Sequence, residues 1–288
     1  MDFSVQLIWQ GALNGLALGG VYILMALGLT LIFGITRIMQ FAHGEVYMLG
    51  AYFVYYLSVS QRLNLLVAML VSMAAMAVLG LGLERFLFRP VQGQMLSPIV
   101  ISVGLTLILQ SGALVGFGIY EKTLPSLADG SFWVLGSAIP RNRVVALAFA
   151  VALIALLYLF LKRSKYGQAI TASAQNPQGA ILQGINPNRM SALSMAIACA
   201  LAAAGGGLAG SIFGLNPFMG TLPLVKGLII IVLGGMGSLL GVVIGGLIIG
   251  IIDGIVPIIV GPGTAAILPL IIVILILLVR PQGLFGHE

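Results

Sequence analysis

The feature that most constrains this chain is a series of apolar runs, each about as long as a helix that crosses a lipid bilayer. A spanning helix needs roughly 20 mostly apolar residues. Runs of this kind cover residues 7–34, 63–83, 98–118, 144–161, 190–213, 239–256 and 264–279. Only 7% of the residues are charged, whereas soluble domains carry roughly 25%. The chain is therefore predicted to be an all-α, polytopic integral membrane protein and a single transmembrane domain over residues 1–288.

Two further apolar runs, at residues 46–57 and 226–233, are too short to cross a bilayer as complete helices. They bring the predicted total to about 8–9 membrane segments, two of them interrupted or half-length. A polar cluster that includes His43 and Glu45 precedes the first short run. A break follows the second, at Gly234, Gly235, Gly237 and Ser238. Non-helical backbone at membrane depth is tolerated only against protein or water. We therefore expect these residues to lie near a translocation pathway, although Glu45 could instead complement a helix N-terminus at the membrane interface.

Asp253 is an acid well inside an apolar segment. An intramembrane carboxylate is costly and is by default a candidate functional residue. Two alternatives remain open: Asp253 pairs with Lys226, or it lies near the outer surface beside a turn at residues 257–263. Lys226 by itself is expected to extend its amine toward the membrane interface.

Glycines recur at four-residue spacing, at Gly11, Gly15 and Gly19 and again at Gly206 and Gly210. Such small-residue faces allow two membrane helices to approach closely. Each half of the chain also has a glycine-faced helix, a short interrupted element and a longer helix. This order suggests an internal repeat, and interrupted segments at matching places indicate a site near the bilayer midplane.

The longest polar break covers residues 162–189 and opens with Lys162, Arg163 and Lys165. Inside it, Asn176 is a favourable N-cap, Pro177 fits a first helical turn, and Gly184 fits a left-handed helix stop. These signals predict a short packed helix to which a cytoplasmic partner docks. The alternative is an ordinary solvated loop.

Basic loops of membrane proteins lie on the cytoplasmic side. We therefore expect the loops at 84–94 and 162–189, and the C-terminus with Arg280, to be cytoplasmic. The 119–143 loop and the N-terminus are then extracytoplasmic.

The sequence contains no P-loop, no H-E-x-x-H, no G-x-S-x-G and no paired-cysteine metal site, and it has only two histidines. We therefore expect no enzymatic activity and no cofactor or metal bound by this chain. Nucleic-acid binding is not indicated by the net charge of +6, because no basic face with interleaved aromatic residues is present. The expected surroundings are membrane lipid.

Three segments resemble the branched-chain amino acid ABC permeases of the LivH/LivM type. They are FAHGEVYMLGAY at 41–52, VLGGMGSLLGVVIGG at 232–246 and RPQGLFG at 280–286. The FAHGE form and its early position favour the LivH side of the family.

The resemblance implies a permease subunit in the bacterial inner membrane, belonging to an importer of leucine, isoleucine and valine. Its partners would be a LivM-like permease or a second copy of this chain, two cytoplasmic subunits that bind ATP and Mg, and an extracytoplasmic substrate-binding protein. The implied ATPase-coupling residues are Gly167, Ala169, Asn176, Pro177, Leu182, Gly184 and Ile185. The implied translocation pathway adds Phe41 to the residues named above.

The same family contains importers of urea, short amides and other amino acids, so these substrates remain alternatives. A rival class is a secondary transporter driven by an ion gradient, which broken helices and Asp253 would also fit.

Overall fold

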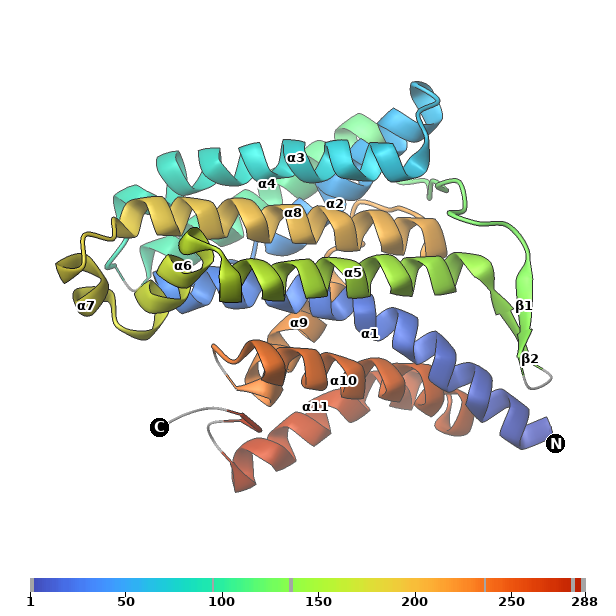
Figure 1. The fold of residues 1–288 in the computed structure, drawn as a ribbon. Helices are drawn as coiled ribbons and strands as arrows, with labels where there is room; N and C mark the ends of the chain where they lie inside the picture. Colours follow the sequence, from blue (N-terminus) through green and yellow to red (C-terminus); the bar gives the residue numbers. More distant parts are fainter. Residues whose placement is uncertain (1–2, 95, 135–136, 236, 281–282, 286–288) are drawn as a thin grey trace.

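The computed structural model describes residues 3–94, 96–134, 137–235, 237–280 and 283–285. Figure 1 shows an elongated bundle whose long helices lie side by side. The α-helices are α1 (Phe3–Thr36), α2 (His43–Tyr55), α3 (Leu65–Leu83), α4 (Ser97–Phe117), α5 (Arg141–Arg163), α6 (Lys165–Gln175), α7 (Pro177–Leu182), α8 (Pro187–Phe213), α9 (Thr221–Gly234), α10 (Leu239–Val260) and α11 (Pro262–Val279). Short irregular helices extend α2 and α3, namely η1 (Tyr56–Ser60), η2 (Glu84–Phe88) and η3 (Arg89–Val91).

Among the described residues, six helices are long and apolar enough to cross a membrane: α1, α3 with its extension to Val91, α4, α5, α8 and α10. The helices α2 and α9 are shorter, with 13 and 14 residues, although η1 continues α2 to Ser60. Another apolar helix is α11. The predicted all-α polytopic fold is confirmed, and so are the two half-length helices.

We name the two ends of the bundle after the elements found there (Figure 1). The α7 end holds α6, α7 and the stretch that follows α11, while the hairpin end holds the start of α1 and the strands β1 (Ser131–Val134) and β2 (Ser137–Pro140). Arg89, in one predicted cytoplasmic loop, contacts Asn188, in the other. The last turn of α1 also lies against α6, because a Cβ at Gly34 would be 3.7 Å from that of Ala174. The segments with the predicted cytoplasmic basic residues therefore share one end.

The helices α1 and α8 form the centre of the bundle. In their most apolar windows 83% and 78% of the residues are buried, compared with 11% in α4. A Cβ added to Gly15 in α1 would lie 2.5 Å from the carbonyl oxygen of Gly250 in α10. Close backbone approach of this kind stabilises membrane helix pairs through van der Waals contact. The predicted glycine-faced contact of α1 is confirmed.

The corresponding helices of the two halves of the chain run in opposite directions through the bundle (Figure 1). The long helix α1 runs from the hairpin end to the α7 end, and the short α2 follows it. In the second half, α8 runs from the α7 end to the hairpin end, and the short α9 follows it. The order long helix, short helix, long helix thus occurs twice with inverted direction, as in transporters built from inverted repeats.

Several predicted boundaries are wrong. The turn expected at 257–263 begins later, because α10 includes Pro257 and ends at Val260. The left-handed Gly261, with φ of 86°, stops the helix there. Residues 84–91 continue α3 as helical turns instead of forming a loop. The 119–143 loop contains an antiparallel hairpin in which Phe132 pairs with Ile139.

Candidate functional site

The starts of the two short helices meet inside the bundle. A Cβ added to Gly44, in the first turn of α2, would lie 2.7 Å from the carbonyl oxygen of Gly220. Gly220 immediately precedes α9, so the N-terminal ends of α2 and α9 cross with their backbones in contact. Both helix dipoles direct their positive ends toward this crossing.

A polar group joins α2, α4 and α9 at the crossing. The side chain of Gln110 donates to Glu45 Oε1 at 3.0 Å and lies 3.5 Å from Thr221 Oγ1. Glu45 is 1% exposed, and its Oε2 atom has no hydrogen-bond partner in the described part of the chain. The carboxylate therefore lies within the bundle, in the first turn of α2, where the helix dipole favours its negative charge.

His43 is fully buried, two residues before Glu45 in the first turn of α2. Its Nε2 atom lies against Gly28 of α1, where an added Cβ would be 2.6 Å away. Within the described ranges, neither ring nitrogen of His43 and neither amide atom of Gln40 has a hydrogen-bond partner. Phe41, between them, is partly buried against the core. Buried polar groups without partners are rare, so this cluster is a candidate for contact with water or substrate, and its place in a pathway stays a prediction.

The glycine-rich break after α9 is hydrogen-bonded to residues that follow α11. The N–H groups of Leu284 and Phe285 donate to the carbonyls of Leu233 and Gly234 at 2.9 and 3.1 Å. Gly235 and Gly237 adopt left-handed φ values of 97° and 92°, and Ser238 accepts from the Gly241 N–H at 3.1 Å to cap α10. The residue between the two left-handed glycines, Met236, lies outside the described residues.

A cavity of about 590 Å³ lies beside α9, and its lining includes Phe213, Gly214 and Asn216 at and just after the end of α8. Within it, Lys226 Nζ is 2.7 Å from Asp253 Oδ1, and their side chains are 7% and 13% exposed. Of the alternatives left open for Asp253, the pairing with Lys226 is confirmed, and the place of Asp253 in a pathway stays a prediction. The expectation that Lys226 reaches the membrane interface is wrong, because the amine is held inside by the carboxylate. Tyr22 of α1 interacts with Asp253 and lines the same cavity.

The segment α6–α7 doubles back against the end of α5. Ser164 accepts from the Gly167 N–H at 2.9 Å and so caps α6. A Cβ at Gly167 would lie 2.5 Å from Leu161 Cα, so a larger residue would push α6 away from α5. Ala169 packs partly buried against the core. The helix pair is thereby fixed to the membrane bundle.

The start and stop of α7 match the sequence signals. Asn176 Oδ1 accepts from the Gly179 N–H at 2.9 Å, and Pro177 occupies the first turn. Gly184 has φ of 79°, and its N–H donates to Ile181 O at 2.9 Å. The predicted short helix is confirmed, as is its cap. Ile185 then returns to the core.

Two apolar side chains of α7 project away from the bundle. Ile181 is 53% exposed and Leu182 is 89% exposed, whereas Ala180 is 5% exposed and faces inward. We call Ile181 and Leu182 the α7 tip. A capped helix that presents two large apolar groups at one end of the molecule is suited to contact another protein.

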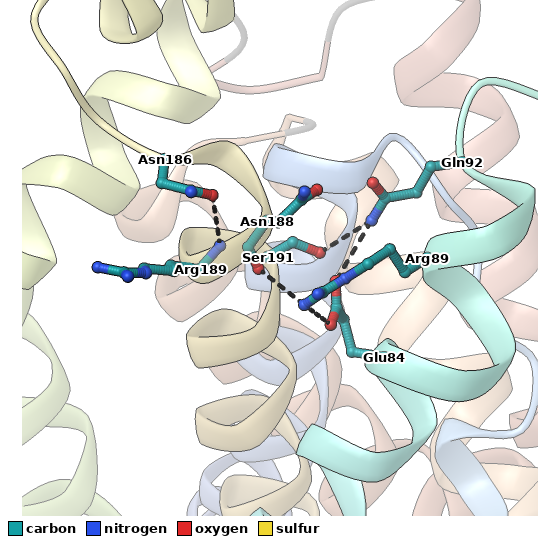
Figure 2. Close-up of polar contacts among 7 residues, drawn as sticks. All are labelled: Glu84, Arg89, Gln92, Asn186, Asn188, Arg189 and Ser191. Atoms are coloured by element: carbon teal, nitrogen blue, oxygen red, sulfur yellow. Dashed lines mark hydrogen bonds and ion pairs between the residues drawn. The ribbon is translucent and has the colours of Figure 1, made fainter.

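A polar network next to this segment ties the end of α3 to the start of α8 (Figure 2). The guanidinium of Arg89 donates to both carboxylate oxygens of Glu84, at 3.2 and 2.6 Å, and reaches Asn188 O at 3.3 Å. Gln92 donates to Ser191 Oγ at 3.2 Å. Asn186 Oδ1 accepts from the Arg189 N–H at 3.2 Å and caps α8. These contacts hold the base from which α7 projects.

Sequence reasoning missed several of these residues. Gln110 is a polar residue inside an apolar run, which was an available signal. Tyr22 and Gln40 had no comparable signal, because their roles depend on helices far apart in the sequence. Glu84 was seen only as the end of an apolar segment.

The fold and these features define an α-helical membrane permease with two half-helices that meet inside it. A sequence model of the family described as "Branched-chain amino acid transport system / permease component" matches residues 11–278, and the chain belongs to this family. It is thus a permease component of a transport system.

Two relatives resemble the chain along nearly its whole length. It is 34% identical to the high-affinity branched-chain amino acid transport system permease protein BraD of Pseudomonas aeruginosa, with 96% of this chain and 95% of the relative covered. It is 33% identical to the LivH permease protein of Escherichia coli K12, with the same coverage. The resemblance to the LivH side of the family is confirmed.

A solved structure shares the fold. The structure titled "PsaBC from Streptococcus pneumoniae in complex with Fab" matches with a TM-score of 0.51 and 14% identity, and covers 91% of this chain and 89% of that one. At this level of identity the likeness concerns the fold alone.

Proposed function

We propose that the chain is the inner-membrane permease subunit of an ABC importer that carries leucine, isoleucine and valine. The observation that carries this proposal is the α7 tip, a rigidly capped pair of exposed apolar residues on a chain of this permease family. Its relatives BraD and LivH are named as permeases of high-affinity branched-chain amino acid systems.

The α7 end is the cytoplasmic end in this proposal. The segments at that end contain Arg37, Arg85, Arg89, Lys162, Arg163, Lys165, Arg189 and Arg280. Fewer basic residues, Arg62, Lys122, Arg141 and Arg143, lie in the segments at the hairpin end. This bias supports a cytoplasmic α7 end under the positive-inside rule, with the hairpin and the start of α1 outside.

Two ATP-hydrolysing subunits then dock on the coupling segment of this chain and of a second permease subunit. The α7 tip fills an apolar groove on the ATPase, while Gly167 and Ala169 fix α6 to the bundle. The second permease is a LivM-like subunit or another copy of this chain. A binding protein delivers the amino acid at the hairpin end.

Movement of α7 reaches the helix crossing through direct contacts. The chain passes from α7 into α8 within a few residues, and α8 packs closely on α2, since a Cβ at Gly206 would overlap the carbonyl of Tyr47. The starts of α2 and α9 meet at Gly44 and Gly220. Closure of the ATPases on ATP thereby changes the relative position of the two half-helices and alternates access to the space between them.

The pairing of Asp253 weighs against the rival ion-driven class. A carboxylate already neutralised by Lys226 at 2.7 Å is poorly suited to bind a coupling proton or sodium ion. Coupling through partner ATPases needs no such site.

The test is to purify the chain from its native membranes in mild detergent and identify its stoichiometric companions by mass spectrometry. We expect a second permease and two P-loop ATPases. The complex is then reconstituted with its binding protein, and leucine uptake is measured in competition with isoleucine, valine and urea. Isolation of the chain alone, or competition by urea but not by valine, would refute the proposal.

A further inference from the structure

The ion pair between Lys226 and Asp253 has an unusual setting. It joins α9 to α10 and lines the cavity of about 590 Å³, whose volume lies within the range of about 300–1,000 Å³ common for small-molecule sites. Each of these side chains is nearly buried, at 7% and 13% exposed. Both charged groups therefore border a space large enough for a small molecule.

The rest of the cavity wall is mainly apolar. The apolar side chains come from α1, from the end of α8 and the connection after it, from α9 and from α10, and include Val21, Phe213, Met219, Ile229 and Pro257. Tyr22 and Asn216 add polar groups. Sites for small molecules combine an apolar lining with a few polar groups that fix orientation. This wall suits a small molecule with an apolar part and a compact polar end.

The pair has little value as a structural clamp. The free-energy cost of removing two charges from water can exceed the free energy gained from their attraction. Replacement of a buried ion pair by uncharged residues of similar volume therefore often leaves stability unchanged or raises it. The neighbouring helices α9 and α10 are already held by close backbone contact, because a Cβ at Gly245 would lie 3.3 Å from Ile230 O. The bundle does not need the pair to keep α9 and α10 together.

We propose that this cavity is a transit site for zwitterionic amino acids, in which Lys226 binds the substrate carboxylate and Asp253 binds the substrate ammonium group. The inference rests on the importer function proposed above and names the groups that recognise its substrate class. Lys226 and Asp253 bind each other until the substrate arrives. The arriving zwitterion exchanges that pair for two new ones.

Lys226 and Asp253 each have a partner of opposite charge both before and after the substrate binds. A zwitterion brings one charge of each sign, so neither Lys226 nor Asp253 is left unpaired in a poorly hydrated space. Urea and short amides carry no charge and would leave the internal pair in place. An amine or a carboxylic acid alone would leave one protein charge without a partner. The geometry thus favours amino acids over the other substrates of the family.

The location fits a step in passage from the hairpin end. Gly214 and Asn216, in the connection from α8 to α9, border the cavity on one side. On the other side it reaches Tyr47, two residues after Glu45 at the helix crossing. A substrate held by Lys226 and Asp253 therefore lies between the outer connection and the point where α2 and α9 meet.

The first test compares the wild-type complex in proteoliposomes with the double variant Lys226→Met, Asp253→Asn. This variant removes both charges, keeps the side chains close in size and leaves no uncompensated charge. We expect leucine uptake to fall by about thirtyfold or more, as for loss of buried charge-assisted contacts, while the complex assembles and melts as the wild type does. Ser72→Ala serves as the control for loss of a buried polar contact, since Ser72 donates to Gly50 O between α3 and α2, away from the cavity.

The second measurement detects binding without transport. The thermal melting temperature of the permease complex, without binding protein, is recorded with leucine, leucinamide, 4-methylpentanoate and 3-methylbutanamide at equal concentration. We expect only leucine to raise it, and only in the wild type.

The possible outcomes separate this inference from the importer proposal. Leucine uptake by the double variant at the wild-type rate would overturn the transit site and leave the importer function intact, as would equal stabilisation by 3-methylbutanamide. A wild-type complex that transports none of the three branched-chain amino acids would overturn both.

Discussion

Gly44 and Gly220 lie backbone to backbone where the two half-helices begin, although 176 positions separate them in the chain. Neither position has room for a side chain, because each faces the other's carbonyl group. The contact determines how near α2 and α9 approach, and it places the Glu45–Gln110 hydrogen bond directly beside the crossing.

Substitution at this contact should weaken the fold. A Cβ in Gly44→Ala would lie 2.7 Å from Gly220 O, and overpacking of this kind costs about 1–3 kcal/mol. We expect a lower melting temperature in detergent and reduced uptake. The control is Gly82→Ala in α3, where an added Cβ meets nothing within 4 Å and where alanine is favoured over glycine by about 0.5–1 kcal/mol. A stable, active Gly44→Ala protein would contradict the importance of the crossing.

The helix stop at Gly184 can be tested with two substitutions. Gly184→Pro removes the N–H that bonds to Ile181 O and excludes the φ of 79°. We expect a protein that inserts and melts normally but hydrolyses ATP without leucine uptake. Gly184→Asn should retain coupling, because asparagine tolerates the left-handed region. Coupled uptake by the proline variant at the normal rate would contradict the proposed role of α7.

The α7 tip should determine ATPase binding without affecting stability. Leu182 is 89% exposed, so Leu182→Ser removes little buried surface from the permease itself. We expect the ATPase subunits to be lost from the purified complex, as judged by size-exclusion chromatography, with an unchanged melting temperature for the permease. Tyr120→Ser, which alters a side chain 81% exposed at the other end, should keep them bound. Retention of the ATPases by Leu182→Ser would place their docking surface elsewhere.

The Glu84 network should contribute to stability. Glu84 has a fully buried side chain and receives two hydrogen bonds from Arg89, and charged hydrogen bonds contribute about 1.5–3 kcal/mol. Glu84→Gln should therefore lower the melting temperature and loosen the start of α8, which hydrogen exchange of residues 187–191 would detect. The neighbouring exposed Arg85, altered to Gln, should change neither. Equal effects of the two substitutions would indicate a general response to charge.

Local signals in the sequence predicted the elements that depend on local chemistry. Asn176, Pro177 and Gly184 specify α7 through contacts within one or two turns, and the structure reproduces them. The short helices could be predicted because the length of an apolar run is read directly from the local sequence. The confirmed pairing of Lys226 with Asp253 was foreseen only as one of several alternatives.

The features that were not predicted depend on distant contacts or on weak local signals. The crossing at Gly44 and Gly220 requires knowledge of which helices are neighbours. The bounds of α6 were not predicted, because its cap at Ser164 is a common residue in a basic stretch. Pro257 suggested a turn, yet in a membrane bundle neighbouring helices help a spanning helix tolerate proline, and α10 continues through it.

The backbone bonds from Leu284 and Phe285 to the end of α9 have a consequence for biosynthesis. The carbonyls of Leu233 and Gly234 acquire these partners only after about fifty more residues have been made, and those residues include the helices α10 and α11. Synthesis must therefore reach residue 285 before the end of α9 gains these hydrogen bonds. A chain that stops before residue 284 would leave the carbonyls of Leu233 and Gly234 without these partners, so the end of α9 is completed later in synthesis than the rest of that helix.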